Sequence, residues 1–303
     1  MPSLSDKVTT ALQETRILIL GSQILLGFQF NAVFHPKFSQ LPEPARALDA
    51  IAYGLMLIAA ILLLAPGSFH RIAEGGDDTL RLHRLTTSTA AAALLPFGAC
   101  LGIDEYIVAG KILGEPLAVA AGLLLAGAAF AAWYLIELIR HERRPGDQDG
   151  EEVMRTSLTA KISTLGTEIR VVLPGAQALL GFQFAAFLSD AFERLPDISK
   201  AVHFGSATIM AVAVVLLMAP AAFHRIATGG DDTKEVDIFG SYAMLVAMFL
   251  LGMSMCGDFY VVLIIVTGME ALAILCSIAA LGIAFALWFG FPLAVRRRGR
   301  SIA

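Results

Sequence analysis

The carboxylates that lie in or beside the apolar stretches are the residues of this chain most able to do chemistry. Four of them recur in pairs: Asp104, Asp258, Glu115 and Glu270. A charge at the centre of a membrane helix costs about 2.5–3.5 kcal/mol on insertion scales, so such groups normally face a partner or water. No other charge lies between Asp258 and Glu270, which places Glu270 within or just under the apolar zone as a candidate proton or cation site. The alternative is that Glu115, which precedes Pro116, only favours a helix N-terminus.

Four glutamines are further candidates for an ion pathway. Gln23 and Gln177 share a helical stripe with Arg16 and Arg170, seven residues before them. Gln29 and Gln183 lie on a different face of the same helices. If the two stripes face each other, Gln23 and Gln177 line a central path. The alternative is that buried amides form hydrogen bonds between helices.

A third group of polar residues gathers beside the ends of the apolar stretches. Its members are Glu14, Arg16, Glu168, Arg170, His70, Arg71, Asp77, Asp78, His224, Arg225, Asp231 and Asp232. These residues form either a cytoplasmic gate or a structural ion-pair cluster. His70 and His224 precede Gly-Gly-Asp-Asp-Thr segments, which predict a glycine C-cap followed by a polar N-cap. Two roles are open for each histidine. It is either a pH sensor or an interfacial residue of the last helical turn whose polar atoms have partners.

Other kinds of site have no support in the sequence. The chain contains no phosphate-binding loop, no Ser/His/Asp set and no metal-ligand spacing, and its three cysteines form no CxxC motif. We therefore expect no enzyme activity, no cofactor and no metal.

The elements that carry these residues must be membrane helices. Hydrophobic residues make up 57% and charged residues 16% of the chain, against roughly 45–50% and about 25% in soluble domains. This composition excludes a soluble enzyme, and the absence of excess positive charge excludes a nucleic-acid binder. The chain is long enough for eight spans of about 20 residues. They are predicted near residues 17–34, 47–66, 85–102, 116–139, 171–188, 202–220, 239–257 and 261–293. The start of the last segment, residues 259–270, is either re-entrant or part of a long helix.

The two halves of the chain are copies of one another. When the sequence is shifted by 154 residues, 35 of the 77 pairs from Ser3/Ser157 to Thr79/Thr233 are identical. Since each half has four predicted spans, both enter the membrane in the same direction. The prediction is an all-α polytopic membrane protein, built as two parallel four-helix repeats about a pseudo-two-fold axis along the membrane normal.

The basic residues predict how the protein is oriented. One side of the predicted membrane carries 17 Lys and Arg residues and the other carries five, which places both termini in the cytoplasm. The predicted domains are the first repeat (1–140), a charged linker (141–156), the second repeat (157–295) and a basic tail (296–303). Membrane lipids are the expected partners, a small ion is a candidate partner, and an oligomer is left open.

The repeated unit resembles a known family of membrane proteins. Its elements are a Glu-x-Arg pair, a Gln-x-Leu-x-Gly-Phe segment and an Ala-Pro-x-x-x-His-Arg segment, here at Glu14, Gln23 and Ala65 and again 154 residues later. They are similar to a bacterial four-span family of uncharacterised function, whose members are often labelled sodium/proton antiporters. The resemblance implies movement of a proton or monovalent cation. The alternative is a non-transporting protein with a structural, lipid-binding or partner-binding role.

Overall fold

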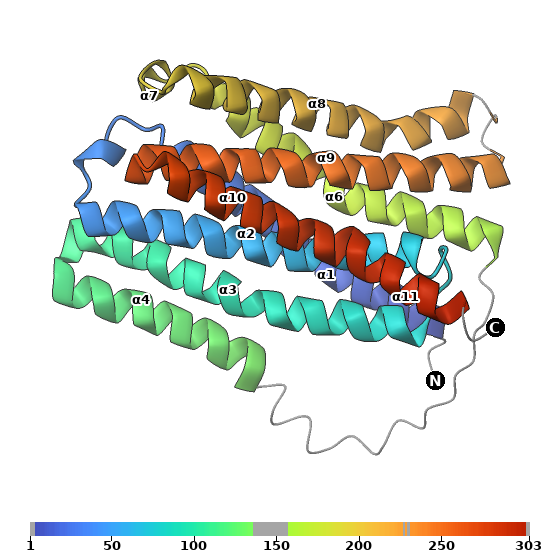
Figure 1. Cartoon of the computed structure of the whole chain (residues 1–303). Helices are drawn as coiled ribbons and strands as arrows, with labels where there is room; N and C mark the ends of the chain where they lie inside the picture. The colour runs from blue at the N-terminus through green and yellow to red at the C-terminus, as the bar shows by residue number, and fades with distance from the viewer. Residues whose placement is uncertain (1–3, 136–156, 227, 229–230, 301–303) are drawn as a thin grey trace.

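A bundle of long helices makes up the protein (Figure 1). The computed structural model describes residues 4–135, 157–226, 228 and 231–300, and these ranges contain no strand, so the predicted all-α class is confirmed. The first half contains α1 (Leu4–Ala32), η1 (Phe38–Gln40), α2 (Glu43–Ile72), α3 (Leu80–Leu113), α4 (Glu115–Phe130) and the π-helical turn η2 (Ala131–Leu135). The second half contains α6 (Leu158–Ala186), α7 (Asp190–Glu193), α8 (Asp197–Ile226), α9 (Lys234–Thr267), α10 (Glu270–Phe285), the π-helical turn η3 (Ala286–Gly290) and α11 (Phe291–Arg300). The predicted linker lies outside the described residues.

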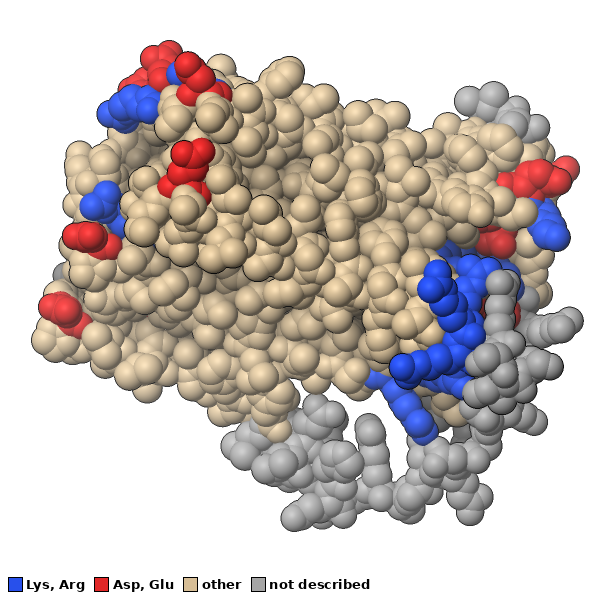
Figure 2. Space-filling view, viewed as in Figure 1, with Lys and Arg blue, Asp and Glu red and all other residues tan. Residues whose placement is uncertain are grey.

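Six helical segments are long and apolar enough to cross a membrane. They are Glu43–Ile72, Leu80–Gly110, Leu158–Ala186, Asp197–His224, Lys234–Thr267 and Glu270–Arg298. The other two predicted spans correspond to shorter apolar segments, Leu18–Ala32 in α1 and Glu115–Phe130 in α4. Figure 2 shows a broad surface of uncharged residues, with Lys, Arg, Asp and Glu gathered at its two ends. These features identify a multi-pass helical membrane protein.

The helices of both halves run in the same directions (Figure 1). The start of α1, the start of α6 and the end of α11 lie at one end of the bundle, which we call the terminal end. At this end Gly75 and Gly76 have positive φ values of 59° and 83°, and the Gly76 N–H donates to the His70 carbonyl at 3.0 Å. The Thr79 hydroxyl then caps α3 by accepting from the Leu82 N–H at 3.1 Å. The predicted cap sequence is therefore confirmed in the first half.

At the opposite end of the bundle, which we call the distal end, one predicted helix boundary is wrong. The seventh span does not stop near residue 257, because α9 continues to Thr267 and ends at Gly268, which has φ of 64°. Residues 259–267 are thus part of α9, and α10 starts at Glu270. Asp258 lies inside this helix, where it accepts a hydrogen bond from Gln183, so a polar residue did not mark the end of the span.

The equivalent helices α1 and α6 pack against each other between the two halves. The ring of Phe28 contacts that of its repeat equivalent, Phe182, with centroids 4.7 Å apart. Gly27 faces the same Phe182 ring, and Gln23 lies against the backbone of Gly175. Side chains therefore fill the described part of this interface.

The last helices of the two halves pack differently. A Cβ atom on Gly102 of α3 would lie 2.8 Å from the Ala126 Cβ atom, so α4 lies very close to α3. The positions equivalent to Gly102 and Gly122 hold Cys256 and Ser277. In the second half α10 starts beside α9 and crosses obliquely toward α2, and η3 and α11 pack on α2 (Figure 1).

Trp288 fixes this crossing. It is fully buried, and its Nε1–H donates to the carbonyl of Ile61 in α2 at 2.7 Å. The equivalent of Ile61 in the second half, Val215, is 66% exposed. The contact that η3 makes at Ile61 of α2 is therefore not repeated at the equivalent position of α8.

Candidate functional site

The most deeply buried polar site in the second half joins α6, α8 and α9. We call it the second amide–carboxyl cluster, and its members are Gln183, His203, Ser254 and Asp258. The Gln183 amide donates to Asp258 Oδ2 at 2.6 Å and to Ser254 Oγ at 2.9 Å. The Ser254 hydroxyl donates to the carbonyl of Ser206 at 2.8 Å. Gln183, Ser254 and Asp258 are each at most 1% exposed, so these hydrogen bonds form away from solvent.

The first half contains the same arrangement, which we call the first amide–carboxyl cluster: Gln29, Asp49, Cys100 and Asp104. The Gln29 amide donates to the two carboxylate oxygens of Asp104 at 3.0 and 3.1 Å and to Cys100 Sγ at 3.0 Å. Each residue stands 154 positions before its counterpart in the second cluster. The structure thus brings together the predicted residues Gln29 with Asp104 and Gln183 with Asp258.

The fourth members of the two clusters differ in charge. His203 Nδ1 lies 3.8 Å from Asp258 Oδ1, and its Nε2 lies 3.1 Å from the carbonyl oxygen of Gln183. In the first half the equivalent residue is Asp49. An aspartate therefore stands in one half where an imidazole stands in the other.

Neither His203 nor Asp49 was among the predicted site residues. His203 is fully buried, and Asp49 is 8% exposed. Four phenylalanine rings surround the imidazole with centroids 4.5–5.7 Å away: Phe30, Phe34, Phe187 and Phe192. The rule that an ionisable residue within a membrane span is a site candidate would have found both residues, because each stands in an apolar stretch.

The remaining pathway candidates lie apart from these clusters. Glu115 and Glu270 are exposed first residues of α4 and α10, the position expected of a residue that favours a helix N-terminus. Gln23 is fully buried between α1 and α6, and its amide atoms have no hydrogen-bond partner. Gln177, its repeat equivalent, is exposed. The structure does not bring these two glutamines into equivalent surroundings.

A buried ion-pair network joins the two halves at the terminal end. We call Glu168, His70, Arg71 and Asp237 the terminal ion-pair cluster. Glu168 of α6 lies 2.6 Å from His70 Nδ1 and 2.7 Å from Arg71 Nε, both of α2. Arg71 Nη1 also lies 3.4 Å from Asp237 of α9. Glu168, His70 and Arg71 are at most 7% exposed, so this part of the predicted ion-pair cluster is present.

The other predicted terminal residues occupy the margin of this network. Asp77 pairs with Lys161 at 2.7 Å. Contacts between a histidine and an aspartate eight residues later occur in both halves, at 3.8 Å for His70–Asp78 and 3.3 Å for His224–Asp232. Exposed residues of this set are Arg16, Arg170, Asp231 and Asp232. The side chains of Glu14 and Arg225 lie outside the described part of the structure.

Two further observations bear on the chemistry of these sites. In the turn after α2, burial raises the pKa of Glu74 above its usual range. Within the described ranges, no three His, Cys, Asp or Glu side chains are grouped as a metal site requires.

Comparison with known proteins identifies the repeated unit. A family model described as "Family of unknown function (DUF6328)" matches residues 4–137 and again residues 151–292. No curated protein and no solved structure matches the chain.

Proposed function

We propose that this chain, which belongs to that family of unknown function with the family model matched twice, moves protons or monovalent cations across a bacterial inner membrane. The two amide–carboxyl clusters are the proposed ion sites. A single observation carries the proposal: the Gln–Asp hydrogen bond forms at equivalent positions in both halves, buried in the second half and partly buried in the first. A carboxyl group in a membrane span is costly and is typical of ion and proton pathways.

The proposal assigns separate roles to the amide and the carboxyl group. Asp104 and Asp258 bind and release the proton or cation. Gln29 and Gln183 hold each carboxylate in position through a donated hydrogen bond of 2.6–3.1 Å. The third residue is Cys100 in the first cluster and Ser254 in the second, whereas both clusters contain the same glutamine and aspartate. This pattern supports a function that depends on the Gln–Asp pair.

The proposal also includes eight membrane spans in two parallel repeats. Adding the five residues of η2 to the 16 of α4 gives 21 residues, or about 30 Å at 1.5 Å per residue, which matches the hydrocarbon thickness. The 29 residues of α1 are longer still. The larger number of basic residues beside the terminal end favours a cytoplasmic location for both termini. Labelling of single cysteines introduced at each end, with a membrane-impermeant reagent, tests this orientation.

The second candidate is a non-transporting membrane protein, in which the same clusters hold helices together. The dense hydrogen bonding of Gln183 favours it, since a buried amide joining two helices stabilises a bundle without any transport. The two candidates differ in their prediction for flux.

Ion flux in liposomes separates these candidates. Purified protein is tested for movement of H⁺, Na⁺, K⁺ and Cl⁻ against empty liposomes, and thermal unfolding is measured in parallel. We expect Asp104→Asn with Asp258→Asn to abolish flux of one cation or of protons. The matched variant, Glu115→Gln with Glu270→Gln, removes two exposed carboxylates and is expected to retain flux. Flux that survives the aspartate changes while stability falls would establish the structural role instead. Loss of flux only in the glutamate variant would move the site to the starts of α4 and α10.

A further inference from the structure

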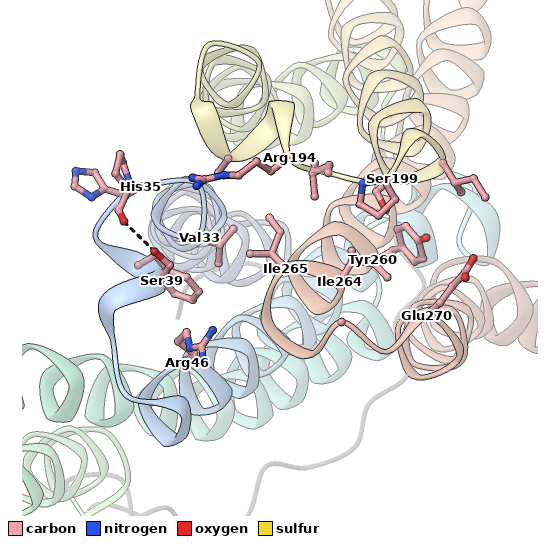
Figure 3. A pocket seen from close by; sticks show the side chains of 17 residues that line it. Val33, His35, Ser39, Arg46, Arg194, Ser199, Tyr260, Ile264, Ile265 and Glu270 are labelled. Carbon is pink, nitrogen blue, oxygen red and sulfur yellow. Dashed lines mark hydrogen bonds between the residues drawn. The ribbon is translucent and has the colours of Figure 1, made fainter.

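A pocket of about 510 Å³ opens at the distal end between the two halves (Figure 3). Its wall is formed by the turn between α1 and α2, the turn between α7 and α8, and the turn between α9 and α10. The volume lies in the range of roughly 300–1,000 Å³ that is usual for small-molecule sites. None of the ion sites proposed above lines it, so the pocket needs its own explanation.

The pocket combines apolar walls with two guanidinium groups. Val33 of the α1–α2 turn and Ile264 and Ile265 of α9 contribute apolar surface. Arg46 and Arg194 enter from opposite sides in Figure 3, with Val33 and Ile265 between them. A site of this composition suits a ligand that is apolar over most of its length and negatively charged at one end.

Both arginines lack a protein partner within the part of the chain that the structure describes. Neither Arg46 nor Arg194 forms an ion pair or a side-chain hydrogen bond there. Arg46 is half-buried, and its Nε is shielded from solvent without a hydrogen-bond acceptor. Arg71 at the terminal end, by contrast, binds Glu168 and Asp237. An unsatisfied, shielded guanidinium N–H indicates that the natural acceptor is not part of this chain.

A buried hydroxyl in the same pocket supports this inference. Ser199 of α8 lines the pocket, is 1% exposed, and its Oγ has no hydrogen-bond partner. Glu270 is the one carboxylate of the lining, and Figure 3 places it on the far side of Tyr260 and Ile264 from the arginines. The side of the pocket that holds Arg46 and Arg194 is therefore positively charged.

We propose that this pocket binds the anionic headgroup of an acyl lipid. Arg46, whose shielded Nε lacks an acceptor, binds the oxygens of a carboxylate or phosphate group, which match the fork of N–H donors on a guanidinium, and Arg194 adds positive charge from the opposite side. The first methylene groups of the acyl chain lie against Val33, Ile264 and Ile265, and the rest of the chain extends into the bilayer. This site is independent of the proposed ion movement.

Calorimetric titration of the full-length protein in a neutral maltoside detergent tests the site. The probes are oleate, oleoyl-lysophosphatidate, zwitterionic oleoyl-lysophosphatidylcholine and inorganic phosphate. We expect saturable binding of one or both anionic amphiphiles, with one molecule per chain. Binding of oleate alone would identify a carboxylate headgroup, and binding of lysophosphatidate alone a phosphate headgroup. Equal binding of the zwitterionic lipid, or binding of inorganic phosphate as tight as that of the amphiphiles, would overturn the proposal.

Two variants place the binding in this pocket. Arg46→Gln with Arg194→Gln is expected to weaken binding at least tenfold. The matched control, Lys37→Gln with Lys200→Gln, removes two positive charges at the same end from residues that do not line the pocket, and it is expected to bind like wild type. Equal affinity of the arginine variant and the control would refute the site. Ser199→Leu fills the pocket and is expected to abolish binding, and thermal unfolding of each variant confirms that it is folded.

Discussion

Glu168 makes the strongest buried ion pairs between the two halves, so its neutralisation should destabilise the protein severely. Its two carboxylate oxygens lie 2.6 Å from His70 Nδ1 and 2.7 Å from Arg71 Nε. Glu168→Gln keeps the size and shape of the side chain and removes its charge. Arg71 then loses its nearest carboxylate, and the acidic side chain that still contacts it, Asp237, is farther away, at 3.4 Å.

The size of the effect follows from the burial of the groups. Removal of one partner from a buried ion pair costs about 3–5 kcal/mol, because the other charge remains desolvated and uncompensated. A glutamine still offers one oxygen to the Arg71 N–H, so the lower end of this range applies. Asp237→Asn is the matched control, since its contact is longer and its side chain is 19% exposed. For such a partly exposed pair we expect a loss of at most about 1 kcal/mol.

The assay is reversible unfolding in mixed micelles of neutral detergent and dodecyl sulfate, followed by the circular dichroism of the helices. The free energies of unfolding of wild type, Glu168→Gln and Asp237→Asn are compared in the same micelles. We expect Glu168→Gln to lose roughly 3 kcal/mol and to be the less stable of the two variants. A loss below about 1 kcal/mol, or a larger loss in Asp237→Asn, would show that the terminal ion-pair cluster does not hold the halves together.

Two further predictions concern the packing of the halves, and both are measured with the same unfolding assay. Gly27→Ala adds a methyl group against the Phe182 ring and should cost about 1–3 kcal/mol through overpacking. Gly181→Ala is its repeat-equivalent control, because nothing lies within 4 Å of the added atom. It should be neutral or stabilising by up to about 1 kcal/mol, and equal losses in the two variants would contradict the packing model. Trp288→Phe removes the 2.7 Å hydrogen bond to the Ile61 carbonyl and leaves a gap in the core, so a loss of roughly 1–3 kcal/mol is expected. An unchanged free energy of unfolding would mean that η3 does not depend on this anchor.

The duplicated sequence does not produce two equal halves. Gly102 and Gly122 let α4 lie close to α3, whereas Cys256 and Ser277 stand at the equivalent positions. The last helix of the first repeat lies close to its own half, whereas that of the second crosses toward α2. The amide–carboxyl clusters also differ, because a single change between Asp49 and His203 alters the charge of the site.

The sequence by itself determined the features that depend on composition and on neighbouring residues. Its apolar content required membrane helices, and the offset of 154 residues identified the duplication. The turn at Gly75 and Gly76 and the cap at Thr79 were predictable because a glycine turn and a threonine cap act within a few residues. Gln29, Gln183, Asp104 and Asp258 were recognisable as candidates because polar groups in membrane helices are costly.

Only the tertiary structure decided which of these residues meet. Gln183 and Asp258 are 75 residues apart, and Glu168 and Arg71 are 97 apart. Contacts over such distances depend on the helix faces that pack together, and a helix with apolar residues all around does not reveal its buried face. For the same reason the arginines of the distal pocket had no pattern along the chain that marked them. Their surroundings are formed by helices from both halves, so they exist only after the helices have packed.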